Sequence, residues 1–127
     1  MMITTLLATT LTIWLMVLSI RVISLRGKTG TSLGAGDVPA LERRIRAQGN
    51  LTEYAPMFVI LIGLAEIQDG SQIVLGGISI LFLAARLSHG YALSFSENSP
   101  AARLFGMATT FTMMGLAALY CLYVALT

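Results

Sequence analysis

The chain has 127 residues, of which 56% are hydrophobic and 11% charged, with a formal net charge of +2 and a mean hydropathy of +0.81. Soluble domains carry about 25% charged residues, so this composition excludes an ordinary soluble protein, and the apolar fraction excludes intrinsic disorder. The single cysteine, Cys121, excludes a disulfide scaffold, and the small net charge argues against nucleic acid as a partner. We therefore expect one small integral membrane domain over residues 1–127.

Four apolar segments predict an all-α integral membrane fold, a bundle of four transmembrane helices. A helix needs about 20 mostly apolar residues to cross the hydrocarbon. The segments cover residues 1–20, extending to about 25, then 51–67, 73–87 and 104–126. No Lys or Arg precedes the first apolar run and no small-residue cleavage site follows it, which argues against a signal peptide.

The connections between these segments carry turn and capping signals. Asp37 before Pro39, and Ser99 before Pro100, each predict a capping side chain followed by a proline in the first helical turn. A tight turn is predicted at residues 69–71. The first connection should be non-helical because it carries four glycines: Gly27, Gly30, Gly34 and Gly36.

The second helix should be longer than the membrane is thick. From residue 38 to 68 it would measure roughly 45 Å at the α-helical rise, so its first three turns should protrude from the hydrocarbon. Pro56 lies inside it, where it either kinks the helix or is simply a tolerated membrane proline.

Basic residues predict the orientation. The connection between the second and third helices has acidic residues and no basic one, whereas every basic residue lies at or near the first or third connection. The positive-inside rule then places these two connections in the cytoplasm and both termini outside. Arg21, Lys28 and Arg44 are candidates for a purely topological role. The full basic set is Arg21, Arg26, Lys28, Arg43, Arg44, Arg46, Arg86 and Arg103.

An ionisable residue within a span is a functional hypothesis by default. Arg46, Asn50 and Glu53 share one helical face, and Arg43 extends it. Arginine grips carboxylates bidentately and glutamate accepts from ammonium groups, so the stripe suits a zwitterionic ligand. An Arg46–Glu53 ion pair that joins helices explains the same spacing.

Two further groups lie near the third connection. Arg86, His89 and Tyr91 could contact a polar ligand or form an interfacial belt. Arg103, in the first turn of the fourth helix, could stabilise a thiolate or could snorkel. Cys121 lies in an apolar helix and is interpreted as inert packing. The sequence shows no metal-binding or phosphate-loop motif.

Residues 46–58, RAQGNLTEYAPMF, resemble the signature of the MAPEG family, the membrane-associated proteins in eicosanoid and glutathione metabolism. The resemblance covers nearly the whole chain, and residues 33–36 look like the short bacterial branch, similar to microsomal glutathione transferase and leukotriene C synthase. It implies a homotrimer that binds glutathione between subunits, near the cytoplasmic side.

The resemblance also implies site residues. Arg103 resembles the arginine that stabilises the glutathione thiolate, and is the implied catalytic residue. Leu93 replaces an expected tyrosine and Gly27 a second arginine, which argues against specific leukotriene synthesis. The implied glutathione contacts are Arg26, Arg46, Gln48, Asn50, Glu53, Tyr54, Arg86, His89 and Tyr91.

The leading hypothesis is therefore a glutathione-dependent transferase or peroxidase in a bacterial inner membrane. Its partners would be membrane lipid, glutathione as cosubstrate, and an apolar electrophile or lipid hydroperoxide. One alternative is a non-catalytic glutathione- or lipid-binding protein, since a fold alone does not prove an enzyme. Another is a small drug/proton exchanger, against which the uncharged residues 1–20 argue.

Overall fold

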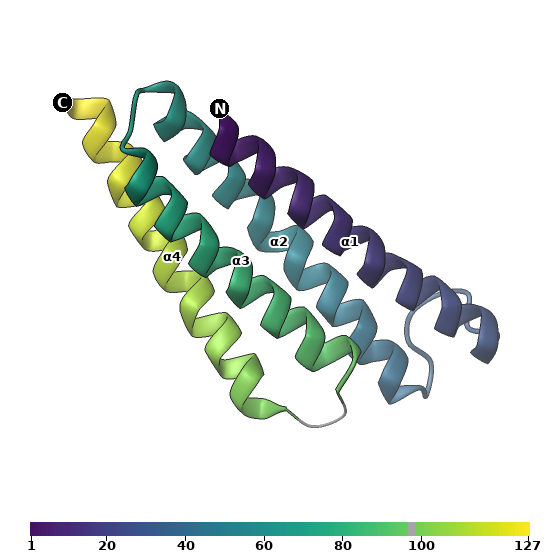
Figure 1. The fold of residues 1–127 in the computed structure, drawn as a ribbon. Coiled ribbons are helices and arrows are strands. Elements are labelled where there is room, and N and C mark those ends of the chain that lie inside the picture. The colour runs from purple at the N-terminus through teal and green to yellow at the C-terminus, as the bar shows by residue number, and fades with distance from the viewer. Residues whose placement is uncertain (97–98) are drawn as a thin grey trace.

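The computed structural model describes residues 1–96 and 99–127, and within them the chain forms four long α-helices (Figure 1). Each is long and apolar enough to cross a membrane, which supports an integral membrane protein. The four predicted spans are thus confirmed as helices. Their bounds are α1 Met2–Thr29, α2 Pro39–Ile67, α3 Gln72–Ser94 and α4 Pro100–Leu126.

The helices run up and down beside one another, so that both termini and the α2–α3 turn lie at one end (Figure 1). The first and third connections lie together at the other end, which we call the connection end. Helices α2 and α3 are central, since each packs on the other three, whereas the described residues of α1 and α4 have no Cα atoms within 8 Å of one another.

The first helix ends later than predicted. Helix α1 continues through Gly27 to Thr29 and stops at Gly30, which has a left-handed backbone with φ 67°. That conformation strains any residue with a Cβ, so Gly30 is the glycine that ends the helix. The prediction that Gly27 belongs to a non-helical connection is wrong.

The starts of α2 and α4 are confirmed at their prolines, while the predicted capping contacts are absent. Pro39 and Pro100 are the first helical residues, where a missing N–H is tolerated. The N-cap of α2 is Val38 and not Asp37, and no side chain of either N-cap residue, Val38 or Ser99, makes a capping hydrogen bond.

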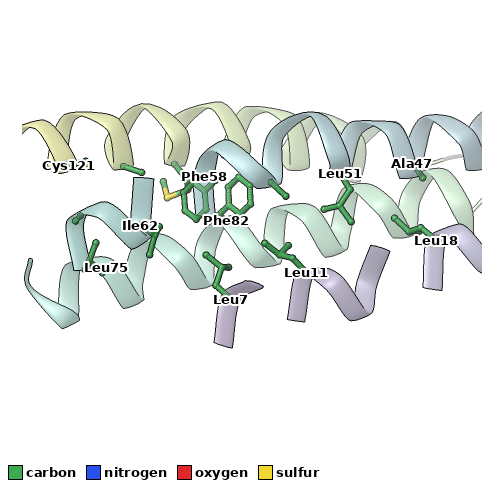
Figure 2. Close-up of a cluster of buried hydrophobic side chains, with 14 of the residues drawn as sticks. Leu7, Leu11, Leu18, Ala47, Leu51, Phe58, Ile62, Leu75, Phe82 and Cys121 are labelled. Carbon is green, nitrogen blue, oxygen red and sulfur yellow. The ribbon is translucent and has the colours of Figure 1, made fainter. Parts of the chain in front are cut away.

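The core is a column of apolar side chains between the helices. At its centre Phe58 of α2 and Phe82 of α3 are stacked with ring centroids 3.7 Å apart, and both are fully buried (Figure 2). Cys121 is buried and free, in agreement with a packing role. Close packing of this kind must hold a membrane bundle together, because lipid is as apolar as the core itself.

A buried carboxylate fastens the other end of the bundle. Glu66 of α2 accepts hydrogen bonds from the backbone N–H of Ile3 and Thr4, at 3.0 and 2.9 Å, and from Thr4 Oγ1 at 2.6 Å. It is also 3.2 Å from the Met1 ammonium group. Glu66 therefore accepts hydrogen bonds from backbone amides in the first turn of α1. These amides have no acceptor within their own helix.

At the connection end, two arginines tie α1 to its neighbours. Arg21 donates through Nε to Ser94 Oγ at 2.8 Å, and its guanidinium lies 3.6 Å from the ring centroid of Phe95. Arg44 of α2 donates to the carbonyl oxygen of Arg21 at 2.8 Å. Both residues therefore pair helices, in addition to any role as topology signals.

Candidate glutathione site

A hollow of about 270 Å³ opens between α2, α3 and α4 towards the connection end. We call it the polar hollow. Four of its side chains come from successive turns of α2, two from adjacent turns of α3, and one from the first turn of α4. They are Glu42, Arg43, Arg46, Asn50, His89, Leu93 and Arg103.

The charges of the polar hollow favour an anion. Three guanidinium groups, those of Arg43, Arg46 and Arg103, surround it, and the one carboxylate in its described lining is Glu42. Guanidinium groups bind carboxylates through two parallel hydrogen bonds, while a carboxylate accepts from an ammonium group. The hollow can therefore hold a ligand that carries several carboxylates and one ammonium group.

A second hollow of about 280 Å³ lies beside the first and shares His89 and Arg103 with it. We call it the α4 hollow. The rest of its described lining is Pro100, Leu104 and Met107, all from the first turns of α4. Arg103 thus lines both a charged space and a largely apolar one.

Buried Arg86 holds the walls of the polar hollow together. It lies on α3 one turn before His89 and is only 2% exposed. Its Nη1 donates to the carbonyl oxygen of Asn50 and its Nη2 to that of Gly106, both at 3.3 Å, while Nε has no partner. The guanidinium also lies 5.6 Å from the ring centroid of Tyr54. Arg86 therefore joins α4 to α2 at Asn50, a residue of the hollow's lining.

Gly106 lets α4 approach α3 closely at His89. A Cβ atom at residue 106 would lie 2.6 Å from the Cβ of His89 and 3.0 Å from the carbonyl oxygen of Ala85. No side chain fits there without moving a helix. This glycine therefore sets how near Arg103, one turn earlier, comes to His89 across the two hollows.

One known protein family matches nearly the whole chain. The MAPEG family model matches residues 4–123. The chain belongs to the MAPEG family. Membership supports a glutathione-related function at a membrane in general terms, since the family includes glutathione transferases and related enzymes as well as non-catalytic members. No individual curated protein gives a significant match.

Four of the MAPEG residues expected from the sequence lie around the same space. Arg46 and Asn50 come from α2, His89 from α3 and Arg103 from α4, although up to 57 positions separate them in the chain, the interval from 46 to 103. Part of the polar stripe on α2 therefore lines one hollow together with side chains from α3 and α4.

Two expected contacts lie on the α1 side instead. Gln48 donates through Nε2 to Ser19 Oγ of α1 at 3.0 Å. Arg26 donates through Nη1 to the carbonyl oxygens of Thr31 and Gly34, at 3.2 and 2.8 Å, in the first connection. Neither side chain lines the polar hollow of this MAPEG chain.

Glu53 and the two tyrosines also lie outside the polar hollow. Glu53 is exposed on α2, and no ion pair joins it to Arg46, both being residues that the structure describes. Tyr54 packs edge to face on Phe111, with ring centroids 5.4 Å apart. Tyr91 is exposed and stacks on Phe95 at 5.4 Å. The single chain therefore shows no Arg46–Glu53 ion pair that could join helices.

Sequence reasoning missed Glu42 and Leu93 as lining residues. Glu42 lies four residues before Arg46 and eight before Asn50, so helical spacing alone would have placed it on their face. Leu93 lies four residues after His89 and was noted only as the site of a missing tyrosine. Its apolar side chain is part of the lining of the polar hollow.

Proposed function

We propose that this protein is a membrane-bound glutathione transferase in which Arg103 stabilises the glutathione thiolate. The single observation that carries the proposal is that Arg46, His89 and Arg103, from three helices, line one hollow with an excess of positive charge. Glutathione carries two carboxylates, one ammonium group and one thiol. This set of charges matches a lining of three guanidinium groups and one carboxylate.

Five side chains of the polar hollow have a task in this proposal. Arg43 and Arg46 bind the carboxylates of glutathione, and Glu42 accepts from its ammonium group. Asn50 donates to and accepts from a peptide group. Arg103 favours the ionised thiol, because a nearby positive charge lowers the pKa of a thiol. The nucleophile belongs to glutathione, so the protein needs no reactive cysteine.

We further propose that the working form is a homotrimer in a bacterial inner membrane, with both termini outside. Exposed Glu53 supports an assembly: by helical rise it lies about 21 Å from Ile67 along α2, at a depth where a lipid-facing carboxylate is costly. A neighbouring subunit would cover it. The remaining expected contacts that are not buried would then meet glutathione across the subunit boundary: Arg26, Gln48, Tyr54 and Tyr91. Arg86, which is 2% exposed and bonded to α2 and α4, would hold the walls of the site and not contact glutathione.

Calorimetric titration of glutathione into the detergent-purified protein tests the binding site. Arg46→Ala should weaken binding by about tenfold or more, since one charge-assisted contact contributes about 1.5–3 kcal/mol. Lys28→Ala is the matched control, because it removes an exposed positive charge at the same end of the bundle and should leave binding unchanged. Equal affinity in all three proteins would contradict the proposed site.

The thiolate itself tests the role of Arg103. Ultraviolet absorbance of the glutathione thiolate should appear on binding to the unaltered protein and be lost in Arg103→Ala, with glutathione affinity largely kept. Conjugation to an aryl halide should fall in parallel. Binding with no turnover of any aryl halide or hydroperoxide by the unaltered protein would identify a non-catalytic family member instead.

A further inference from the structure

We propose that Arg21 and Arg44 form a binding site for the phosphate of an anionic phospholipid, in the leaflet at the connection end of the bundle. We call these two residues the arginine pair. Neither of them lines the polar hollow or the α4 hollow. The proposal therefore concerns a different place on the chain and does not depend on the proposed binding of glutathione.

The arginine pair brings two positive charges together without a carboxylate. Arg44 of α2 donates through Nη1 to the backbone carbonyl oxygen of Arg21 at 2.8 Å, and the two guanidinium groups lie close enough to repel one another. In the part of the chain that the structure describes, the only ion pair is the one at Glu66, at the opposite end of the bundle. The described partners of the arginine pair are neutral, so a bound anion would relieve a repulsion that they leave in place.

The guanidinium group of Arg21 is already held in a fixed position. Its Nε donates to Ser94 Oγ at 2.8 Å and its Nη2 to the carbonyl oxygen of Ser94. Its plane also lies over the ring of Phe95, 3.6 Å from the centroid. Among the described residues, Nη1 of Arg21 and the remaining N–H groups of Arg44 have no acceptor. A phosphate could therefore accept from both side chains with little further ordering of Arg21.

The arginine pair lies at the depth of lipid phosphates. By helical rise, Arg21 is about 27 Å along α1 from Ile3, close to the roughly 30 Å thickness of the hydrocarbon. Phe95, which Arg21 contacts, stacks on Tyr91 with ring centroids 5.4 Å apart, and both rings are exposed, by 41% and 58%. Exposed aromatic side chains are typical of the level where headgroups meet acyl chains. The anion most available at this place is therefore a lipid phosphate.

Trp14 lies where the acyl chains of such a lipid would run. It precedes Arg21 by two helical turns, so the two side chains share a face of α1 about 10 Å apart along its axis. Both pack on Phe95, since the Trp14 ring stacks on it with centroids 6.0 Å apart. Trp14 is half-buried and is the only tryptophan of the chain. Its fluorescence can therefore report on a lipid whose headgroup is bound at Arg21.

The charge of the headgroup decides which phospholipid binds. Phosphatidylcholine and phosphatidylethanolamine carry a cationic group beside the phosphate, which the arginine pair would repel. Phosphatidylglycerol has a net negative charge, and basic residues at a membrane surface attract anionic lipids of this kind. We therefore expect the site to prefer phosphatidylglycerol over a zwitterionic lipid.

The test measures quenching of Trp14 fluorescence by lipids that carry bromine in their acyl chains at the depth of Trp14. The full-length protein is reconstituted into phosphatidylcholine vesicles that contain increasing amounts of brominated phosphatidylglycerol or, in a parallel series, brominated phosphatidylcholine. The ratio of the two lipid-binding constants should be about ten for the unaltered protein, the factor that one hydrogen bond to a charged group typically contributes. It should fall towards one in Arg21→Gln, whose amide can still donate to Ser94.

Lys28→Ala is the matched control, because it removes an exposed positive charge from the same end of α1 and should keep the ratio. Arg44→Gln keeps the test decisive if Arg21→Gln does not fold. Its amide can still donate to the Arg21 carbonyl oxygen, so it removes the charge alone, and the ratio should fall here as well.

Three results would overturn the proposal. The first is a ratio near one for the unaltered protein, and the second is an unchanged ratio in the arginine variants. The third is relief of the quenching by millimolar inorganic phosphate, because the ligand would then be a free anion and not a lipid. A ratio that falls in the arginine variants and not in Lys28→Ala, and that ignores inorganic phosphate, would support a lipid site at the arginine pair.

Discussion

The guanidinium group of Arg86 donates to the backbone carbonyl oxygen of Asn50 at 3.3 Å, across the α2–α3 boundary. The same group donates to the carbonyl oxygen of Gly106 on α4. A buried arginine whose described partners are neutral is expensive to keep in a membrane bundle. Its planar fork, which reaches two helices at once, explains why arginine and not lysine stands here.

We therefore predict that Arg86→Lys loosens the polar hollow. A lysine ammonium group cannot span both carbonyl oxygens, and the one left without a donor should cost about 1–3 kcal/mol. Thermal unfolding in detergent should show a clear loss of stability, together with weaker glutathione binding. The control is Arg44→Lys, because Arg44 makes one interhelical hydrogen bond that a lysine can also make. Equal melting temperatures for the two variants would contradict this role.

Gly106→Ala should push α4 away from α3. The added methyl group would lie 2.6 Å from the Cβ of His89, and overpacking of this kind costs about 1–3 kcal/mol. Gly115→Ala is the matched control on the same helix, since nothing lies within 4 Å of its Cβ position. There the better helix propensity of alanine should raise stability by up to about 1 kcal/mol. Opposite signs for the two substitutions in an unfolding titration would verify the close approach, and matching signs would contradict it.

Thr4→Val should weaken the contact between α1 and Glu66. The Thr4 hydroxyl donates to this buried carboxylate at 2.6 Å, and loss of a hydrogen bond to a charged group costs about 1.5–3 kcal/mol. Thr10→Val provides the comparison, because Thr10 donates only to the Leu6 carbonyl of its own helix. Hydrogen exchange of the first amides of α1 should accelerate in the first variant alone. Similar exchange in both would show that Glu66 does not fasten this end.

Phe82→Ala tests the centre of the core. The lost ring leaves a cavity opposite Phe58, and the surrounding side chains lose their dispersion contacts. We expect a destabilisation of at least about 2 kcal/mol. This loss arises even though lipid is as apolar as the core, so that exposing core side chains to lipid carries no hydrophobic cost. Phe105→Ala, at a position 53% exposed, should change stability little. A comparable loss at both positions, measured by detergent unfolding, would argue against packing as the main stabilising force.

The helices were predictable because length and apolarity alone decide whether a segment can span a membrane. Their ends were less so. The apolar segment of α3 is predicted to end near residue 87, whereas the helix continues to Ser94. Arg86 and His89 are buried among other helices of the protein. These polar residues therefore do not mark the point where the helix leaves the apolar layer. Which glycine ends α1 likewise depends on backbone conformation, which composition does not reveal.

The candidate site was predictable only as far as one helix could reveal it. Spacing placed Arg46 and Asn50 on a common face, and both line the polar hollow. Glu53 continues that face by one further turn, but the hollow ends before it. Where a hollow ends is decided by the neighbouring helices, here α3 and α4, and no periodicity within α2 contains that information.

The shortness of the α2–α3 turn has a consequence for biogenesis. Only residues 68–71 separate the two helices. The turn is closed by hydrogen bonds from Gly70 N to the Ala65 oxygen at 2.9 Å and from Ser71 N to Tyr120 Oη at 2.7 Å. Because the turn is so short, α2 and α3 cannot be inserted into the membrane far apart from one another. We expect the translocon to release them as a single helical hairpin, with α4 arriving later to lock the turn through its tyrosine.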